Sequence, residues 1–253
     1  MFELAKLYLS DKSPIVTAHR GFSGKYPENT LLAFEMAYKL GVDIIEFDVR
    51  ESIDGELLIM HDSSVNRTTN GSGEINELHF DYIRSLNASY WHGARDTGYR
   101  LEKPTYNIMQ VPTLREVLTF CADKDVGINI QVYAESPEAV KKICALYDEF
   151  DLYKKAFLMI TTFARAQEVK TINSLIEVCV GEERQNLKRH KDFGSRIMQS
   201  NKEIVSPELC REIKRFELWA NMFFSNTIEE NEKYLGYGIQ GIMTDQPQLI
   251  IKK

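Results

Sequence analysis

Two acidic side chains stand two positions apart within an apolar run of the chain. The run is V-D-I-I-E-F-D-V-R, from Val42 to Arg50. Because a strand turns successive side chains to opposite faces, Glu46 and Asp48 would share one face. Two carboxylates this close raise each other's pKa unless a cation lies between them, and oxygen ligands suit Mg²⁺, Ca²⁺ or Mn²⁺. The spacing indicates a hard-metal site; the alternative is an edge strand with a solvated acidic face.

Two histidines end apolar runs that have matching alternation. His19 ends I-V-T-A-H, and His61 is the penultimate residue of E-L-L-I-M-H-D. Imidazoles titrate near neutrality, so one can accept a proton while the other donates one. Arg20 follows His19 and could bind a phosphoryl group through two hydrogen bonds. Two histidines beside a carboxylate metal site favour acid–base catalysis around a metal-bound anion.

The other histidines and a nearby arginine have simpler interpretations. His79, His92 and His190 are expected to be satisfied polar residues of the core or the surface. Arg67, in N-R-T-T-N-G, could contact substrate, but support of its own loop is favoured. Asp62 would either orient His61 or cap the loop.

Strand and helix signals alternate along the chain as a barrel of parallel strands requires. A strand at 15–19, a helix capped by Asn29 or Thr30 and the acidic strand form one strand–helix–strand unit. The same alternation continues from residue 112 to residue 244. Eight strand candidates predict a (β/α)₈ TIM barrel, in which reactive groups lie at the C-terminal ends of the strands. A doubly wound open sheet is the alternative, but the glycine-rich phosphate fingerprint of that fold is missing.

Residues 63–111 interrupt this rhythm and are predicted to be a small insertion after the second strand. Their glycine-rich turn and aromatic, polar stretch are typical of a lid or substrate wall on the catalytic side of the barrel. No linker or internal repeat divides the 253 residues, and a single domain over 1–253 is expected.

Composition limits the partners and the compartment. The 43% hydrophobic and 27% charged residues suit a globular protein, and a net charge of -6 argues against nucleic acid as a partner. No uncharged run is long enough for an integral membrane segment. The first ten residues resemble an amphipathic helix rather than a signal peptide. Four widely separated cysteines are expected to be buried thiols in a reducing compartment, which predicts a cytoplasmic protein.

Several ordered motifs resemble the glycerophosphodiester phosphodiesterase family. They are H-R-G followed by P-E-N-T, then E-F-D, D-G-E-L-L-I-M-H-D and R-T-T-N-G-S-G, and later V-P-T-L-R-E-V-L and G-I-Q-G-I-M-T-D-Q-P. The resemblance implies a (β/α)₈ barrel that cleaves a small-molecule glycerophosphodiester to glycerol 3-phosphate and an alcohol. It also implies one divalent cation, Mg or Ca.

The resemblance assigns roles to residues of the first half of the chain. His19 and His61 would be the acid–base pair, Glu46 and Asp48 metal ligands, and Arg20 a phosphate contact. A glycerol hydroxyl of the substrate would attack phosphorus, and water would then open the resulting cyclic phosphate. Such a route needs two proton carriers and no protein nucleophile.

The third strand departs from the family pattern N-I-E-I-K, because residues 129–133 read N-I-Q-V-Y. Gln131 would replace a glutamate as metal ligand through its carbonyl oxygen, and Tyr133 would replace a phosphate-binding lysine. Weaker metal binding is expected, because cation affinity follows ligand charge. Trp219 is retained from a late family motif as a substrate-side residue, although Ala220 follows it in place of threonine.

These departures keep two further functions open. The first is a phosphodiesterase that acts on a different substrate, such as a sugar or lysophospholipid phosphodiester. The second is a catalytically silent barrel that binds a phosphodiester or a polyol. Retention of both histidines and both carboxylates argues against the silent barrel.

Overall fold

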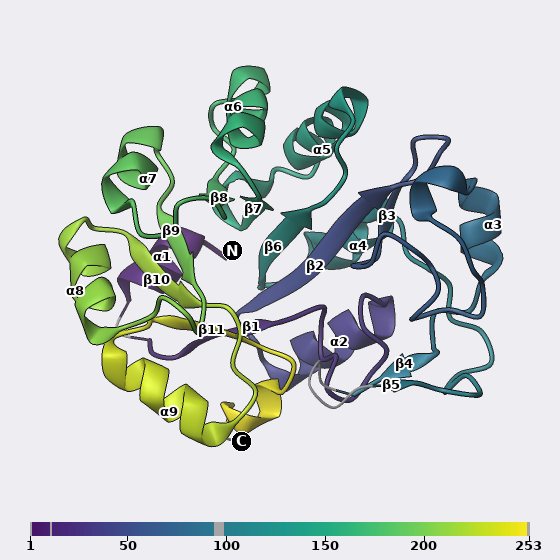
Figure 1. The fold of residues 1–253 in the computed structure, drawn as a ribbon, viewed down its shortest axis with the longest axis horizontal. Coiled ribbons are helices and arrows are strands. Elements are labelled where there is room, and N and C mark those ends of the chain that lie inside the picture. The colour runs from purple at the N-terminus through teal and green to yellow at the C-terminus, as the bar shows by residue number, and fades with distance from the viewer. Residues whose placement is uncertain (1, 11, 94–98, 252–253) are drawn as a thin grey trace.

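Eight parallel strands form a nearly closed barrel in the computed structural model, which describes residues 2–10, 12–93 and 99–251 (Figure 1). The strands pair in the order β8-β7-β6-β2-β1-β11-β10-β9. Their bounds are β1 (Ile15–Ala18), β2 (Ile44–Glu51), β6 (Gly127–Val132), β7 (Ala156–Ile160), β8 (Val178–Val180), β9 (Ile197–Ser200), β10 (Trp219–Met222) and β11 (Gly241–Thr244). Between β8 and β9, Ser195 Oγ donates to the Val178 carbonyl over 2.6 Å. The predicted TIM barrel is confirmed.

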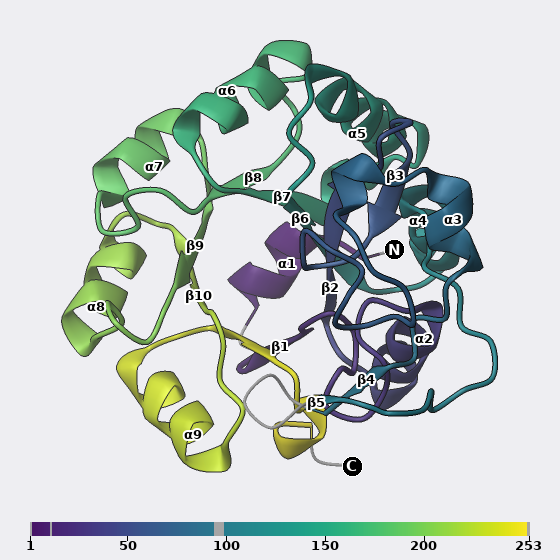
Figure 2. The same ribbon diagram turned by 45° about the vertical axis from the view of Figure 1, so that its right-hand side comes forward.

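Helices surround the barrel, as Figure 2 shows in a view along its opening. They are α2 (Leu31–Leu40), α4 (Leu114–Ala122), α5 (Pro137–Glu149), α6 (Phe163–Ile172), α7 (Leu187–Phe193), α8 (Pro207–Arg215) and α9 (Ile228–Tyr237), with short helices η2 (Leu152–Lys154) and η3 (Pro247–Leu249). Local sequence explains their ends: Thr30 Oγ1 accepts from the Ala33 N–H at the start of α2, and Gly41 ends that helix with φ 93°.

The main core lies between the strands and this layer of helices. Ile45, Phe47 and Val49 of β2 are all fully buried there, so the alternate residues of the strand face the barrel interior. The four cysteines are buried thiols without disulfides, as expected. No helix in the part of the chain that the structure describes is long and apolar enough to cross a bilayer.

Helix α1 (Leu4–Leu9) covers the end of the barrel where the strands begin (Figure 2). Its Leu4 and Tyr8 are buried in one apolar cluster with Ile15, Ile44 and Trp219, which start or lie near the start of their strands. That end of the barrel is therefore closed by packing, and a site for polar chemistry must lie at the other end.

A hairpin follows β2 in place of a further barrel strand. Strand β3 (Leu57–Ile59) pairs antiparallel with β2, with Ile59 beside Val49, and the Met60 N–H donates to the Asp48 carbonyl over 3.0 Å. The run predicted to end at His61 thus stops as a strand at Ile59. Because the hairpin turns back, it still returns His61 to the level of Asp48.

The predicted insertion after the second strand is present, and its described residues, 63–93 and 99–111, carry four short elements. They are η1 (Ile75–Glu77), α3 (Phe80–Ser85), β4 (Trp91–His92) and β5 (Tyr99–Arg100). Val65, Ile83 and Val111 of the insertion form an apolar cluster with Leu58 of β3. It packs over the β2–β3 hairpin and brings Trp91 to the mouth of the barrel.

Candidate active site

The two acidic side chains of β2 are buried on the interior face of the barrel. Glu46 and Asp48 are 3% and 1% exposed. The backbone N–H of Arg20 donates to Glu46 Oε2 over 2.7 Å, and Asn29 Nδ2 donates to Asp48 Oδ2 over 2.7 Å. Burial, reinforced by the charge of Asp48, raises the pKa of Glu46 well above its usual value. Such a pair of carboxylates is stabilised by a nearby cation.

A tight turn after β1 explains the H-R-G motif. Arg20 and Gly21 both have left-handed backbones, with φ 54° and 76°. A Cβ on Gly21 would lie 2.7 Å from the carbonyl carbon of Ala33, so only glycine fits without a shift of α2. The turn directs the Arg20 N–H back to Glu46, and a non-glycine residue in this conformation marks a constrained site.

His19 is held by a carboxylate from the far end of the chain. Its Nδ1 lies 2.6 Å from Asp245 Oδ1. Asp245 is fixed in turn by Ser23 Oγ, which donates to Oδ1 over 2.9 Å, and by Asn226 Nδ2, which donates to Oδ2 over 2.7 Å. An Nδ1–H held in this way leaves Nε2 as the nitrogen that can exchange a proton with substrate.

His61 has the same arrangement with its sequence neighbour. Its Nδ1 lies 2.8 Å from Asp62 Oδ1, and its side chain is 26% exposed. Arg67 binds Asp62 through Nε and Nη2, over 2.7 and 2.9 Å. Burial alone would raise the pKa of Asp62, but His61 and Arg67 outweigh burial and lower that pKa. Asp62 therefore orients His61, which was one of its two predicted roles.

A buried carboxylate joins the His61 side of the site to Arg20. Glu28 accepts from Arg20 Nη1 over 2.8 Å and from both terminal nitrogens of Arg67 over 2.8 and 2.7 Å. Burial alone would raise the pKa of Glu28, but the two arginines outweigh burial and lower it to about 2. Arg20 Nε also lies 3.3 Å from Asp48 Oδ2. Arg67 thus supports its loop, in agreement with the favoured interpretation.

Two predicted residues, one in β6 and one just after it, lie beside the acidic pair. Gln131 is the register partner of Asp48, and its Nε2 donates weakly to the Met159 carbonyl over 3.4 Å. Tyr133 follows β6, and its ring meets the His61 ring edge-on at 5.5 Å. Burial, reinforced by the charge of Asp48, raises the pKa of Tyr133 to about 12. Both side chains therefore belong to the same end of the barrel as the histidines.

A cavity of about 240 Å³ opens between these groups. It is lined by Arg20, Ser23, Glu28, His61, Asp62, Arg67, Trp91, Gly93 and Asp245. Asp245, the partner of His19, thus shares a cavity with His61. The structure therefore brings the two histidine–aspartate pairs, Arg20 and the wall from the insertion to one mouth of the barrel.

The donor set around β2 fits a hard cation. Glu46 and Asp48 are paired in register with Asn129 and Gln131 of the neighbouring strand. The buried Asn129 Oδ1 has no hydrogen-bond partner among the residues that the structure describes. Carboxylate and amide oxygens are ligands that Mg²⁺ and Ca²⁺ accept. Within the described ranges, no three His, Cys, Asp or Glu side chains cluster as metal ligands. Among the described residues, Glu46 and Asp48 would therefore need amide oxygens from the neighbouring strand to complete such a site.

Trp219 does not lie with the other predicted site residues. It is the first residue of β10, and its ring stacks on Tyr8 of α1 at 4.7 Å with an interplanar angle of 5°. The Arg196 side chain also packs on the Trp219 ring, with its guanidinium carbon 4.6 Å from the ring centroid. The prediction that Trp219 is a substrate-side residue is therefore wrong, because the start of a strand lies at the closed end of the barrel.

Two phenylalanines after β10 occupy the position beside His19 instead. The ring of Phe224 stacks on His19 at 5.8 Å, and the ring of Phe223 meets His19 edge-on at 5.7 Å. Both follow Met222, the last residue of the strand. The F-F pair at a strand end was the signal that could have identified them.

The remaining histidines lie elsewhere. His190 is buried, with Nε2 3.0 Å from the Glu182 carbonyl, and burial lowers its pKa. His79 is exposed, with Nδ1 3.7 Å from Asp54 Oδ2. Both are polar residues with partners, as expected, while the side chain of His92 lies outside what the structure describes.

Comparison with known proteins shows what this chain is similar to. The sequence model of the glycerophosphoryl diester phosphodiesterase family matches residues 19–249. A glycerophosphodiester phosphodiesterase of Caldanaerobacter subterraneus subsp. tengcongensis is 29% identical over 246 residues, covering 94% of this chain and 96% of that protein.

Solved structures share the fold at lower identity. A structure from Silicibacter pomeroyi has a TM-score of 0.84 at 20% identity, covering 98% of this chain and 95% of that chain. An Oleispira antarctica phosphodiesterase in complex with the product sn-glycerol-3-phosphate has a TM-score of 0.78 at 23% identity, covering 94% and 95%. At this level of identity, the likeness shows the fold alone.

Proposed function

Because the chain belongs to the glycerophosphoryl diester phosphodiesterase family, we propose that it hydrolyses glycerophosphodiesters to glycerol 3-phosphate and an alcohol. The observation that carries this proposal is the pair of imidazoles, each held at Nδ1 by a carboxylate, at one mouth of the barrel. An Oleispira antarctica phosphodiesterase of the same fold binds the product named here.

The two imidazoles divide the proton transfers between them. In the first half of the reaction, the neighbouring glycerol hydroxyl attacks phosphorus, and one imidazole Nε2 accepts the proton of that hydroxyl. The bond from phosphorus to the leaving alcohol breaks, and the other imidazole, protonated at the start, donates its proton to the leaving oxygen. A cyclic phosphate results.

In the second half, the roles of the imidazoles reverse. The imidazole that lost its proton accepts one from water as water attacks the cyclic phosphate, and the protonated one returns a proton to the glycerol oxygen. Asp245 and Asp62 stabilise each imidazolium without leaving their hydrogen bonds. No protein nucleophile is required.

Glu46, Asp48 and Gln131 would hold one divalent cation, Mg or Ca. When bound, that cation would neutralise negative charge on the phosphoryl oxygens. Arg20 would contact phosphate from the side of Glu28, and the ring of Tyr133 would border the substrate beside His61. The two carboxylates and the orphaned amide oxygen of Asn129 support this metal assignment.

Release of glycerol 3-phosphate from a panel of glycerophosphodiesters tests the proposal. We expect turnover with Mg²⁺ or Ca²⁺ and none with excess chelator. Turnover that chelator leaves unchanged would contradict the metal assignment. Turnover confined to phosphodiesters without a glycerophosphoryl group would contradict the substrate assignment.

A further inference from the structure

Arg50 continues the row of interior side chains that begins with Glu46 and Asp48. It is two residues beyond Asp48 on β2, hence on the same face of the strand and about 6.6 Å nearer the mouth. Its side chain is only partly buried. The positively charged Arg50 therefore lies between the two carboxylates and the mouth of the barrel. The reaction steps proposed above give it no role.

Two contacts hold the Arg50 side chain in place. Its Nε donates to the His61 carbonyl over 2.7 Å, and its guanidinium carbon lies 4.6 Å from the centroid of the Tyr133 ring. Because that ring also meets the imidazole of His61 edge-on, Arg50, Tyr133 and His61 form one cluster. Stacking on an aromatic face pre-organises a guanidinium for a planar anion.

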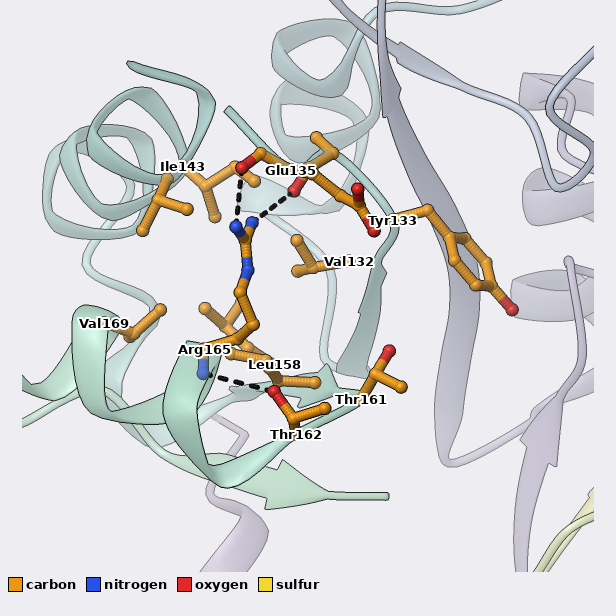
Figure 3. A pocket seen from close by; sticks show the side chains of 12 residues that line it. Val132, Tyr133, Glu135, Ile143, Leu158, Thr161, Thr162, Arg165 and Val169 are labelled. Atoms are coloured by element: carbon orange, nitrogen blue, oxygen red, sulfur yellow. Dashed lines mark hydrogen bonds between the residues drawn. The ribbon is translucent and has the colours of Figure 1, made fainter. Parts of the chain in front are cut away.

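Tyr133 is itself held in position, so that its ring can stack on Arg50. Behind it, a cavity of about 150 Å³ lies between β6, β7, α5 and α6 (Figure 3). Arg165 crosses that cavity and donates to the carbonyls of Glu135 and Ala134 over 2.6 and 3.0 Å. Figure 3 shows the Tyr133 ring turned away from the cavity. The backbone beside Tyr133 is thus clamped while its ring faces the site.

Arg50 differs from the other two arginines of the site in its charge partners. Arg20 is held by Glu28 and lies beside Asp48, and Arg67 makes four hydrogen bonds to Glu28 and Asp62. Among the residues that the structure describes, Arg50 has no carboxylate within ion-pair distance, and its Nε bonds a neutral carbonyl. Its terminal nitrogens therefore remain available to an anion.

We propose that Arg50, stacked on Tyr133, binds a phosphoryl oxygen of the substrate on the His61 side of the site. Arg20 and Arg50 would then flank the phosphoryl group, one on each side of Asp48. The inference rests on the proposed function for the identity of the anion, but binding of the anion can be measured without turnover. It assigns Tyr133 the role of a positioning residue for Arg50.

Calorimetric titration with sn-glycerol 3-phosphate, inorganic phosphate and glycerol, in saturating Mg²⁺, tests this proposal. We expect Arg50→Gln to weaken both phosphate ligands by about 10- to 100-fold, the loss of one charge-assisted contact, and to leave glycerol binding unchanged. Arg115→Gln removes the same charge from an exposed pair with Glu149 on the helical surface and should change none of the three affinities.

Affinity of Arg50→Gln for both phosphates within twofold of the native value would overturn the proposal, as would the absence of phosphate binding to the native protein. If Arg50→Gln does not fold, Tyr133→Leu is the second test. Loss of the ring on which Arg50 stacks should weaken phosphate binding by about 3- to 30-fold. Unchanged binding would overturn the inference. A protein that binds phosphate through Arg50 yet hydrolyses no glycerophosphodiester would support this inference and contradict the proposed function.

Discussion

Asp245 Oδ1 lies 2.6 Å from His19 Nδ1, although the two residues are 226 positions apart in the chain. The parallel pairing of β1 with β11 places them together, because both residues follow the last register pair, Ala18 with Thr244. Closure of the barrel therefore completes the site. A carboxylate at Nδ1 selects the tautomer and the orientation of the ring, which are the properties that a general acid or base needs.

Asp245→Asn should lower kcat by on the order of 10²- to 10⁴-fold with little change in KM, because the amide cannot hold His19 in the required tautomer. Steady-state kinetics across pH would measure this loss and should show a displaced profile. Ser23→Ala, which removes one donor to Asp245, should cost much less. A kcat of Asp245→Asn within threefold of native would argue against the orienting role.

Glu28→Gln should lower the free energy of unfolding at neutral pH by roughly 3–5 kcal/mol, because it leaves two arginines around a buried site without their shared carboxylate. The folded pKa of Glu28, about 2, lies below its ordinary 4.5. A depressed folded pKa stabilises the protein above pH 4.5, and this contribution is lost as pH falls towards 2.

Urea unfolding of the native protein and Glu28→Gln between pH 7 and pH 2 measures both effects. The difference in unfolding free energy should be largest above pH 4.5 and shrink below it. Glu149→Gln, which removes an exposed partner of Arg115, should change the midpoint little at any pH. A gap between native and Glu28→Gln that stayed constant down to pH 2 would refute this account of the arginine pair.

Gln131→Glu should tighten binding of Mg²⁺ or Ca²⁺ by about tenfold, because it adds a third charged ligand beside Asp48. The same change should destabilise the chelated protein, since three buried carboxylates then repel one another. Metal titration and thermal melts with and without chelator would show both effects. Unchanged metal affinity would remove Gln131 from the ligand set.

Trp219→Leu should lower the unfolding temperature and leave KM within about twofold of native, because the ring packs on Tyr8 at the closed end of the barrel. Phe224→Leu removes the ring stacked on His19 and should reduce kcat with a smaller effect on stability. Melting curves and kinetics on both variants make the comparison. A raised KM in Trp219→Leu, with Phe224→Leu unaffected, would reverse these assignments.

Local patterns predicted the parts of the fold that local chemistry decides. The starts of α5 and α8 can be read from local sequence, because Ser136 and Ser206 cap these helices and a proline follows each cap. The alternation in β2 correctly placed Glu46 and Asp48 on the face opposite the core residues of the strand.

Contacts between residues far apart in the sequence decided the parts of the site that were not predicted. The T-D-Q-P segment carried no sign that its aspartate would meet a histidine in the first strand, and nothing near Glu28 marked it as the partner of both Arg20 and Arg67. Trp219 was misplaced because it is the first residue of β10 and so lies at the closed end of the barrel. The site therefore lies four residues later, at Phe223.

Turnover by the two histidine variants tests the central claim most directly. Glycerol 3-phosphate release would be measured at saturating substrate and metal for His19→Ala, for His61→Ala and for the double variant, with His79→Ala as an exposed control. Each single variant should lose kcat by at least about 100-fold, and the double variant little more, because the two imidazoles act in one proton-transfer cycle. Retention of near-native kcat by either His19→Ala or His61→Ala would contradict the account.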